Sequence, residues 1–225
     1  MGYQQEYQQS LADKEAFWAE QADQIAWYKS PTKILSDADY GTHRWFADGE
    51  LNSCYLAVDH QVESGRGDQV ALYYDSPATN SKKAITYNQL LDDVRQFAGV
   101  LKAQGIGKGD RVVIYMPMVP EAAVAMLACA RLGAVHSVVF GGFAPNELAI
   151  RINDAEPKLV ITASCGIEFD KVIEYKPLVD QAFELAAHKP SSCIVLQRPM
   201  AKAELQAGRD IDWHQAHEGV EPADC

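Results

Sequence analysis

Long apolar runs and paired cysteines are both missing from this 225-residue sequence. The longest apolar stretches, VVIYMPMV and AVAMLACA, are too short to cross a bilayer, which excludes a transmembrane helix. The five cysteines are odd in number, widely spaced and without a CxxC pair. Their pattern excludes a disulfide framework and the usual zinc site, and it predicts reduced thiols that act as small core residues.

Basic residues are also scarce. The chain has 20 Lys and Arg against 31 Asp and Glu, which gives a formal net charge of −11. Such a charge repels phosphate backbones and anionic lipids at long range, so neither nucleic acid nor a membrane is an expected partner. A local basic site could still bind an anionic cofactor. The amino terminus has no basic start followed by an apolar run, so we expect no secretory signal and a cytoplasmic location.

Several patterns that carry chemistry in other proteins are absent or incomplete. No GxxxxGK[ST] stretch occurs, which excludes a P-loop. GIGKGD (105–110) has alternate glycines but precedes a strand, whereas a phosphate-binding loop follows one. His214 and His217 lack the closing pair of zinc ligands, and no spacing indicates a catalytic triad. The sequence therefore predicts no metal site and assigns no catalytic residue.

The first 66 residues differ from the rest of the chain. SLADKEAFWAEQADQIAW (10–27) predicts one amphipathic helix, with Ser10 or Asp13 as its N-cap. Residues 28–66 are rich in aromatic and turn residues, and we expect them to be irregular and to wrap a larger domain. The sequence thus predicts a helical and irregular amino-terminal extension, residues 1–66, before a domain of residues 67–225.

That domain has alternating strand and helix patterns. VALYYD (70–75) and KAITY (83–87) predict a hairpin, and Thr86 with Gln89 has the spacing of a capping box at the start of a helix. Further strands are expected at 111–116, 134–140, 158–163 and 192–197, and helices at 120–132, 145–156 and 176–188. Apolar strands separated by helices predict an α/β fold with a parallel sheet flanked by helices. The tail from residue 201 loses periodicity and is expected to add no element.

FGGF (140–143) is the first candidate site, because it follows a strand and precedes a helix. Ligands of open parallel sheets bind beyond the carboxyl ends of the strands. Gly141 and Gly142 would let the backbone turn and approach a ligand closely. Taken alone, the residues favour a plain tight turn between a strand and a helix.

SCGIEFDK (164–171) is the second candidate site, predicted as a loop after a strand end. Its Lys171 is either a solvated lysine or a point charge for a phosphate, and the residues alone favour the first interpretation. His136 lies inside an apolar strand and is predicted to be a hydrogen-bonded core histidine. The residues by themselves therefore predict an α/β domain that could hold an anion.

Long segments of the sequence resemble one enzyme family, the AMP-forming acetate and propionate CoA ligases of the adenylate-forming superfamily. FWAEQADQIAWYKSPTKIL (17–35) and RWFADGELNSCYLAVDH (44–60) resemble its amino-terminal extension. GDRVVIYMPMVPEAAVAMLACARLGAVHSVVFGGFAPNELAIRI (109–152) resembles the first half of its adenylation domain. ITASCGIE (161–168) is more similar to the propionate branch, because acetate enzymes tend to carry an acidic pair before the glycine and an arginine at the position of Glu168.

The resemblance implies an acid–thiol ligase that acts in two half-reactions. ATP and Mg²⁺ serve the formation of a propionyl-adenylate from the small-molecule carboxylate, and the thiol of CoA then displaces AMP. For CoA, it implies that Phe140, Gly141 and Gly142 lie near the adenine and phosphates. Lys171 stands where the family commonly has an arginine, and Glu168 departs from a pattern of two basic residues in that loop.

The resemblance also implies that this chain is the amino-terminal fragment of a propionyl-CoA synthetase, truncated before the phosphate loop of the AMP-binding domain. An acetate–CoA ligase fragment, or a natural short paralogue that binds CoA without catalysis, are the alternatives. We expect the chain alone to be inactive and to hold no cofactor tightly. Its surface toward the remainder of the domain should be apolar, so self-association is expected.

Overall fold

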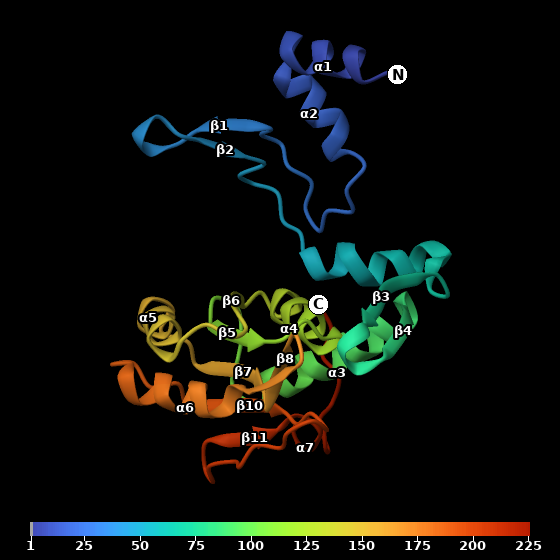
Figure 1. The fold of residues 1–225 in the computed structure, drawn as a ribbon. Coiled ribbons are helices and arrows are strands. Elements are labelled where there is room, and N and C mark those ends of the chain that lie inside the picture. The colour runs from blue at the N-terminus through green and yellow to red at the C-terminus, as the bar shows by residue number, and fades with distance from the viewer. Residues whose placement is uncertain (1) are drawn as a thin grey trace.

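The computed structural model of the protein describes residues 2–225 and is built around a parallel sheet (Figure 1). The sheet strands are β5 (Arg111–Met116), β6 (Val135–Phe140), β7 (Leu159–Ala163), β10 (Ser192–Leu196) and β11 (Asp210–Asp212). Their order is β11-β10-β7-β5-β6, and every neighbouring pair is parallel. The flanking helices are α3 (Tyr87–Ala103), α4 (Pro120–Arg131), α5 (Pro145–Ala155) and α6 (Tyr175–Leu185). The predicted α/β fold is confirmed.

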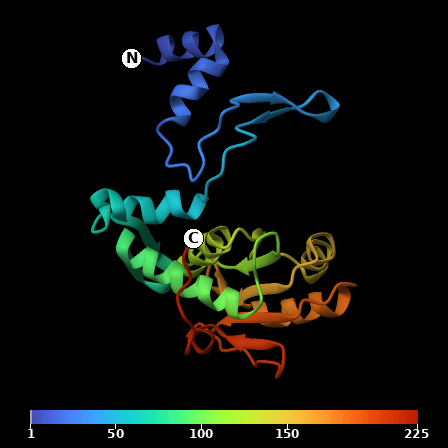
Figure 2. The ribbon, with the colours of Figure 1, turned by 180° about the vertical axis from the view of Figure 1, so that it is seen from behind.

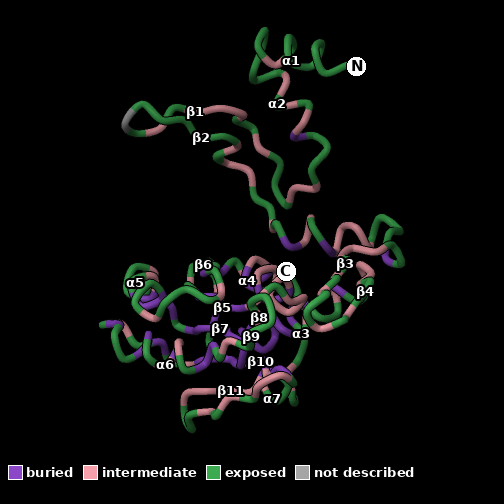
Figure 3. The backbone as a smooth tube through the Cα atoms, in the orientation of Figure 1, coloured by how far each residue is buried: buried purple, intermediate pink, exposed green. Residues whose placement is uncertain are grey.

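The core consists of two apolar layers, one on each face of the sheet. On β7, Leu159 and Ile161 pack into the cluster formed with α3 and α4, whereas Val160 packs into the cluster formed with α5 and α6. Successive side chains of a strand point to opposite faces, so both sets must be apolar when helices cover both faces. The buried residues accordingly run through the middle of the body (Figure 3), and the central strands read as continuous apolar runs.

The predicted hairpin before α3 is present as β3 (Val70–Ser76) and β4 (Ser81–Thr86), which pair antiparallel. The capping box is confirmed as well. The backbone N–H of Gln89 donates to Thr86 Oγ1 over 3.3 Å, and the backbone N–H of Thr86 donates to Gln89 Oε1 over 2.9 Å. Both hydrogen bonds of the capping box join residues three positions apart in the sequence, which explains why the sequence alone predicted it.

The single amino-terminal helix predicted over 10–27 was wrong. The chain forms α1 (Tyr3–Ala12) and α2 (Lys14–Ala22), separated by Asp13 in an extended conformation. Asp13 Oδ1 accepts a hydrogen bond from the backbone N–H of Ala16 over 3.0 Å. Its carboxylate thus satisfies a free donor of the second helix, which favours a new helix start at this position.

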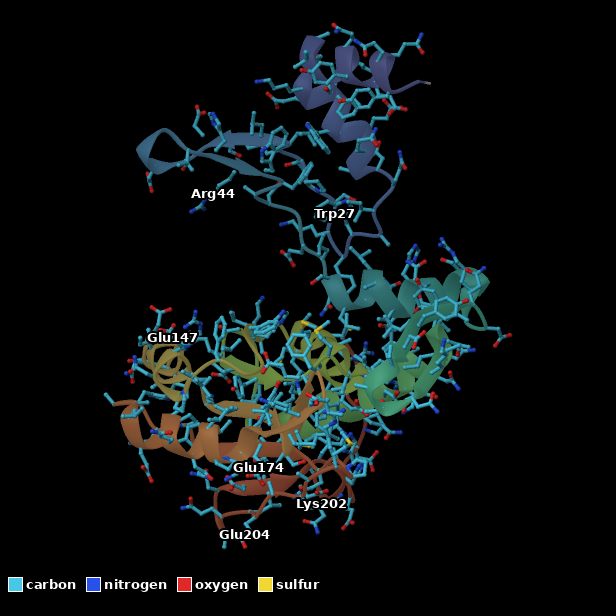
Figure 4. All side chains as sticks on the ribbon, in the orientation of Figure 1. Trp27, Arg44, Glu147, Glu174, Lys202 and Glu204 are labelled. Carbon is cyan, nitrogen blue, oxygen red and sulfur yellow. The ribbon has the colours of Figure 1, made fainter. Side chains whose placement is uncertain are left out.

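Residues 28–66 are more regular than predicted. They contain a hairpin of β1 (Leu35–Asp37) and β2 (His43–Trp45), followed by helical turns that include η2 (Tyr55–Asp59) and η3 (Val62–Arg66). Cys54 and Val58 are fully buried in the core cluster that includes α3. The part with α1, α2 and the β1–β2 hairpin, which holds Trp27 and Arg44, projects away from the α/β body (Figures 2 and 4).

Three further predictions about local structure were wrong. The segment 164–171 is part of a hairpin, β8 (Cys165–Glu168) with β9 (Lys171–Glu174), where a loop was expected. The tail adds β11 and α7 (Trp213–Ala216), because Trp213 stacks on Phe97 of α3 with ring centroids 3.9 Å apart. His136 is exposed, because β6 is an edge strand of the sheet.

None of the described helices combines the length and apolarity needed to cross a membrane.

Candidate functional site

A cavity of about 440 Å³ opens beyond the carboxyl ends of β5 and β6. Its wall includes the end of β5, the FGGF turn, the β8–β9 hairpin, the start of α6 and the residue that follows the segment 192–197. The first turn of the β3–β4 connection closes another side. Parallel strands place their following loops at one edge of the sheet, so segments distant in sequence converge there.

The FGGF turn has a geometry that requires glycine at two successive positions. A Cβ atom on Gly141 would lie 2.6 Å from Tyr175 Oη and 2.8 Å from the carbonyl oxygen of Met116. Gly142 has a φ of +98°, which side chains other than glycine rarely adopt, and open space lies beside its Cα. The structure shows that Gly141 permits the close approach of Tyr175, and that the turn at Gly142 faces open space.

Two tyrosines hold this turn in place. Tyr115 Oη accepts a hydrogen bond from the backbone N–H of Gly142 over 3.1 Å and donates one to the carbonyl oxygen of Phe143 over 2.9 Å. The ring of Tyr175 lies 5.1 Å from that of Tyr115. Burial raises the pKa of Tyr115, and burial followed by the charge of Tyr115 raises the pKa of Tyr175 to about 12. Both hydroxyl groups therefore remain protonated near neutral pH.

The structure brings four of the five predicted site residues to the cavity. Phe140, Gly141, Gly142 and Glu168 line it, and Lys171 is not among the described lining residues. Phe140 is 70% exposed, which leaves most of its ring free for contact. Glu168 and Lys171 are directly opposed across the β8–β9 hairpin, so Lys171 lies next to the cavity wall and opposite a carboxylate.

Arg198 is a wall residue that the sequence analysis missed. It is 9% exposed, and its Nη1 donates to the carbonyl oxygen of Cys165 over 3.0 Å. Its backbone N–H donates to Ser164 Oγ over 2.8 Å. Among the described lining residues it is the one lysine or arginine. The sequence contained the information needed to find it, because Arg198 directly follows the predicted strand 192–197. Ligands of open parallel sheets bind beyond the carboxyl ends of strands, and this argument, made above for FGGF, applies to Arg198 as well.

Nothing in the sequence indicated that Tyr115 and Tyr175 belong to the site. Tyr115 lies inside an apolar run and Tyr175 begins a helix, so each reads as a packing residue. His214 and His217 belong elsewhere, since His217 Nδ1 lies 2.7 Å from the carbonyl oxygen of Trp213, and its ring stacks on Phe97. The contacts of His217 are therefore structural. The cavity as a whole offers an exposed aromatic ring, a glycine turn and one buried cation, which are groups that bind a ligand.

Two family models match the chain, and together they cover almost all of it. Residues 58–225 match the model described as AMP-binding enzyme. Residues 3–57 match the model described as acetyl-coenzyme A synthetase N-terminus. The first match alone includes well over half of the chain, and it contains the whole parallel sheet and the cavity wall.

Several known proteins are similar to this chain. An uncharacterized protein of Pseudomonas aeruginosa is 63% identical over 100% of this chain and 36% of its own length. The mitochondrial acyl-CoA synthetase short-chain family member 3 of Rattus norvegicus is 48% identical over 99% of this chain and 33% of its own length. Acetoacetyl-CoA synthetase from Streptomyces lividans has a similar structure, with a TM-score of 0.85 and 25% identity, covering 100% of this chain and 34% of that one.

The chain therefore spans about a third of the length of these relatives. The matched residues include the amino-terminal segment, the parallel sheet and the FGGF turn. From sequence and structure together, the protein belongs to the AMP-binding enzyme family.

Proposed function

We propose that the complete protein is an AMP-forming propionate–CoA ligase, and that residues 1–225 contribute part of its CoA site. The observation that carries the proposal is the FGGF turn, which lies on the wall of a cavity at the carboxyl edge of the sheet. The similarity of ITASCGIE (161–168) to the propionate branch supports propionate over acetate. An acetate–CoA ligase is the alternative.

In the proposed arrangement, Phe140, Gly141 and Gly142 receive the adenine and phosphates of CoA. The exposed ring of Phe140 offers an apolar face to a base, and the glycines leave room for the backbone to approach it. Lys171 supplies a charge for a phosphate, partly offset by Glu168 across the hairpin. These residues bind and orient CoA, and they take no part in bond breaking.

We place the adenylation step on parts of the complete protein outside residues 1–225. In that step a propionate oxygen attacks the α-phosphorus of ATP and pyrophosphate leaves, while Mg²⁺ offsets charge on the phosphates. The CoA sulfur then attacks the acyl carbon of the adenylate and AMP leaves. The described residues of this chain would hold the CoA nucleotide during the second step.

The substrate is tested by kinetics on the complete protein. We expect its kcat/KM to be higher for propionate than for acetate, with AMP and pyrophosphate as products. The 225-residue chain should show no propionate-dependent exchange between ATP and pyrophosphate. A preference for acetate would overturn the propionate assignment, and exchange by the short chain would overturn our placement of the adenylation groups.

The CoA site is tested by two charge changes on one hairpin. Lys171→Gln should raise the KM for CoA with little change in kcat, and Glu168→Gln should lower that KM by removing a negative charge from the wall. Lys102→Gln is the matched control, because this exposed lysine ends α3 at the amino edge of the sheet, opposite the cavity. Equal effects of Lys171→Gln and Lys102→Gln would contradict the site.

We also propose that residues 1–66 form the extension and residues 67–225 the first part of the AMP-binding domain. The projecting arrangement of α1, α2 and the β1–β2 hairpin supports a separate extension (Figure 1), whose last turns, with Cys54 and Val58, pack into the core beside α3. Limited proteolysis tests it. Cleavage should occur in the connections of the projecting part before any cleavage within the parallel sheet.

A further inference from the structure

A cluster of two cysteines, a carboxylate and an arginine lies away from the cavity. Cys54 is fully buried at the start of the helical turns after the projecting hairpin, and Cys225 is exposed. The Sγ atoms of both cysteines and a carboxylate oxygen of Asp59 all lie within 4.8 Å of one another. Cys54 and Cys225 are far apart in sequence, so only the fold brings their thiols together.

The segment before Cys225 is held firmly against the helices. The backbone N–H of Ala223 donates to the carbonyl oxygen of Arg95 over 3.0 Å, and Arg131 Nε donates to the carbonyl oxygen of Ala223 over 2.7 Å. A Cβ atom on Gly99 of α3 would lie 2.1 Å from the carbonyl oxygen of Glu221, so this close approach requires glycine. These contacts fix the position of Cys225 relative to Cys54.

The surroundings of Cys54 favour a thiolate. Cys225 Sγ donates to Asp59 Oδ2 over 3.9 Å. The pKa of Cys54 is lowered, first by the neighbouring thiol of Cys225; burial opposes this shift, and Arg131 reinforces it. Arg131 Nη1 lies 3.7 Å from Cys54 Sγ. The pKa of Cys225 is raised, first by the neighbouring Cys54 and then by burial. The pair thus combines one activated sulfur with one exposed thiol, whereas burial raises the pKa of the core residue Cys129 to about 12.

The same three side chains could also suggest a metal site, but the charges oppose it. Arg131 donates to both carboxylate oxygens of Asp59, over 2.7 and 2.9 Å. The carboxylate is therefore already paired, and the guanidinium beside Cys54 would repel a bound cation. Two sulfurs next to one arginine are better suited to oxidation than to zinc.

We propose that Cys54 and Cys225 are a modification site at which a peroxide oxidises the two thiols to a disulfide. The Cys54 thiolate attacks one peroxide oxygen, the O–O bond breaks, and the departing hydroxide takes the proton of Cys225. The Cys225 thiolate then attacks the sulfenic sulfur, the S–O bond breaks, and the leaving hydroxide becomes water with a solvent proton. The two sulfurs lose two electrons, hydrogen peroxide gains them, and two waters form.

The site is independent of the proposed ligase activity. A disulfide here would covalently join the helical turns at residues 53–66 to the segment that crosses α3 and α4. The Sγ atoms have to approach by about 3 Å at most to reach bonding distance. Side-chain rotation of the exposed Cys225 can supply much of that movement.

The test uses the complete protein with hydrogen peroxide as the probe. After treatment, free thiols are alkylated, the protein is digested without reductant, and the peptides are identified by mass spectrometry. We expect a cross-linked pair of peptides that contains Cys54 and Cys225 and separates on reduction. Cys225→Ser and Cys54→Ser should each abolish it. Cys193→Ser should retain it, because that fully buried residue lies in the opposite core layer.

Because Cys54 is buried, Cys225→Ser is the decisive variant, and circular dichroism checks that its fold is retained. Oxidation of Cys225 to a sulfinic acid in the wild-type protein without the cross-link would overturn the proposal. Stoichiometric zinc in the purified protein that is lost in both serine variants would also overturn it, in favour of a metal site.

Discussion

Arg131 and Asp59 form a bidentate ion pair, with Nη1–Oδ2 and Nη2–Oδ1 distances of 2.7 and 2.9 Å. The arginine side chain is 1% exposed. The pair joins α4 to the helical turns of the amino-terminal segment, and the third guanidinium donor holds the carbonyl oxygen of Ala223. One buried side chain thus connects three segments that are distant in sequence.

Removing the negative charge of this pair should destabilise the fold. Asp59→Asn leaves the buried guanidinium without its counter-charge, and we expect the free energy of unfolding to fall by about 3 to 5 kcal/mol. Urea denaturation of the 225-residue chain, followed by tryptophan fluorescence, measures it. Glu147→Gln is the control. Glu147 lies on α5 (Figure 4) and forms an exposed pair with Arg151, so this variant should cost less than about 1 kcal/mol. Similar losses in both variants would contradict the buried role of Asp59.

A second buried carboxylate should give the stability a pH dependence. Burial would raise the pKa of Asp210, but hydrogen bonds from Arg209 and Lys176 outweigh it and hold the pKa below its usual value. A carboxyl group with a lowered folded pKa stabilises the protein fully above its unfolded pKa of about 3.9. This contribution is lost as the pH falls through the folded pKa.

We therefore expect Asp210→Asn to cost roughly 3 kcal/mol at pH 7, because it leaves the buried Lys176 and the half-buried Arg209 with only the carboxylate of Asp180 as partner. The difference from wild type should shrink as the pH is lowered below about 4. Urea denaturation of both proteins across this range measures it. A difference that stays constant down to pH 2 would show that the charge of Asp210 is not what stabilises the fold.

Gly142 offers a test that separates strain from ligand binding. Gly142→Ala places a side chain at a positive φ beside the cavity, and we expect a stability loss of about 1 to 2 kcal/mol together with weaker CoA binding. Gly208→Ala introduces the same kind of strain at a φ of +81°, also facing open space, but outside the cavity wall. Calorimetry with CoA should show weaker binding for the first variant alone. Equal affinities would remove the turn from the proposed CoA site.

The 225-residue chain should self-associate through its β6 edge. In the part of the chain that the structure describes, β6 pairs with β5 on one side only and so forms an edge of the sheet, and its Val138 is 54% exposed. Exposed apolar edges promote pairing between chains. We expect Val138→Glu to reduce the weight-average mass in sedimentation equilibrium at high concentration. Ile150→Glu, at a similarly exposed site on α5, is the control and should change it little. A monomeric wild-type chain at these concentrations would contradict the prediction.

Much of the fold could be predicted from the sequence because its signals are local. The capping box of Thr86 and Gln89 involves residues three positions apart, and β7 is buried at every position because helices cover both faces of the sheet. The FGGF turn was found for the same reason, since it sits between a clear strand and a clear helix. Its contacts with Tyr115 and Tyr175 could not be predicted, because packing across the sheet edge brings those rings to the turn.

By itself, then, the sequence determined the alternation of strands and helices, the α/β class and the position of the glycine turn. Local hydrogen bonding and the periodicity of apolar residues are sufficient for each of these. Only the tertiary structure decided that the tail supplies β11 and α7, that β6 is an edge strand, and that Arg131 meets Asp59 from 72 residues away. These features depend on contacts between distant segments, whose energies arise only when the chain is folded around one core.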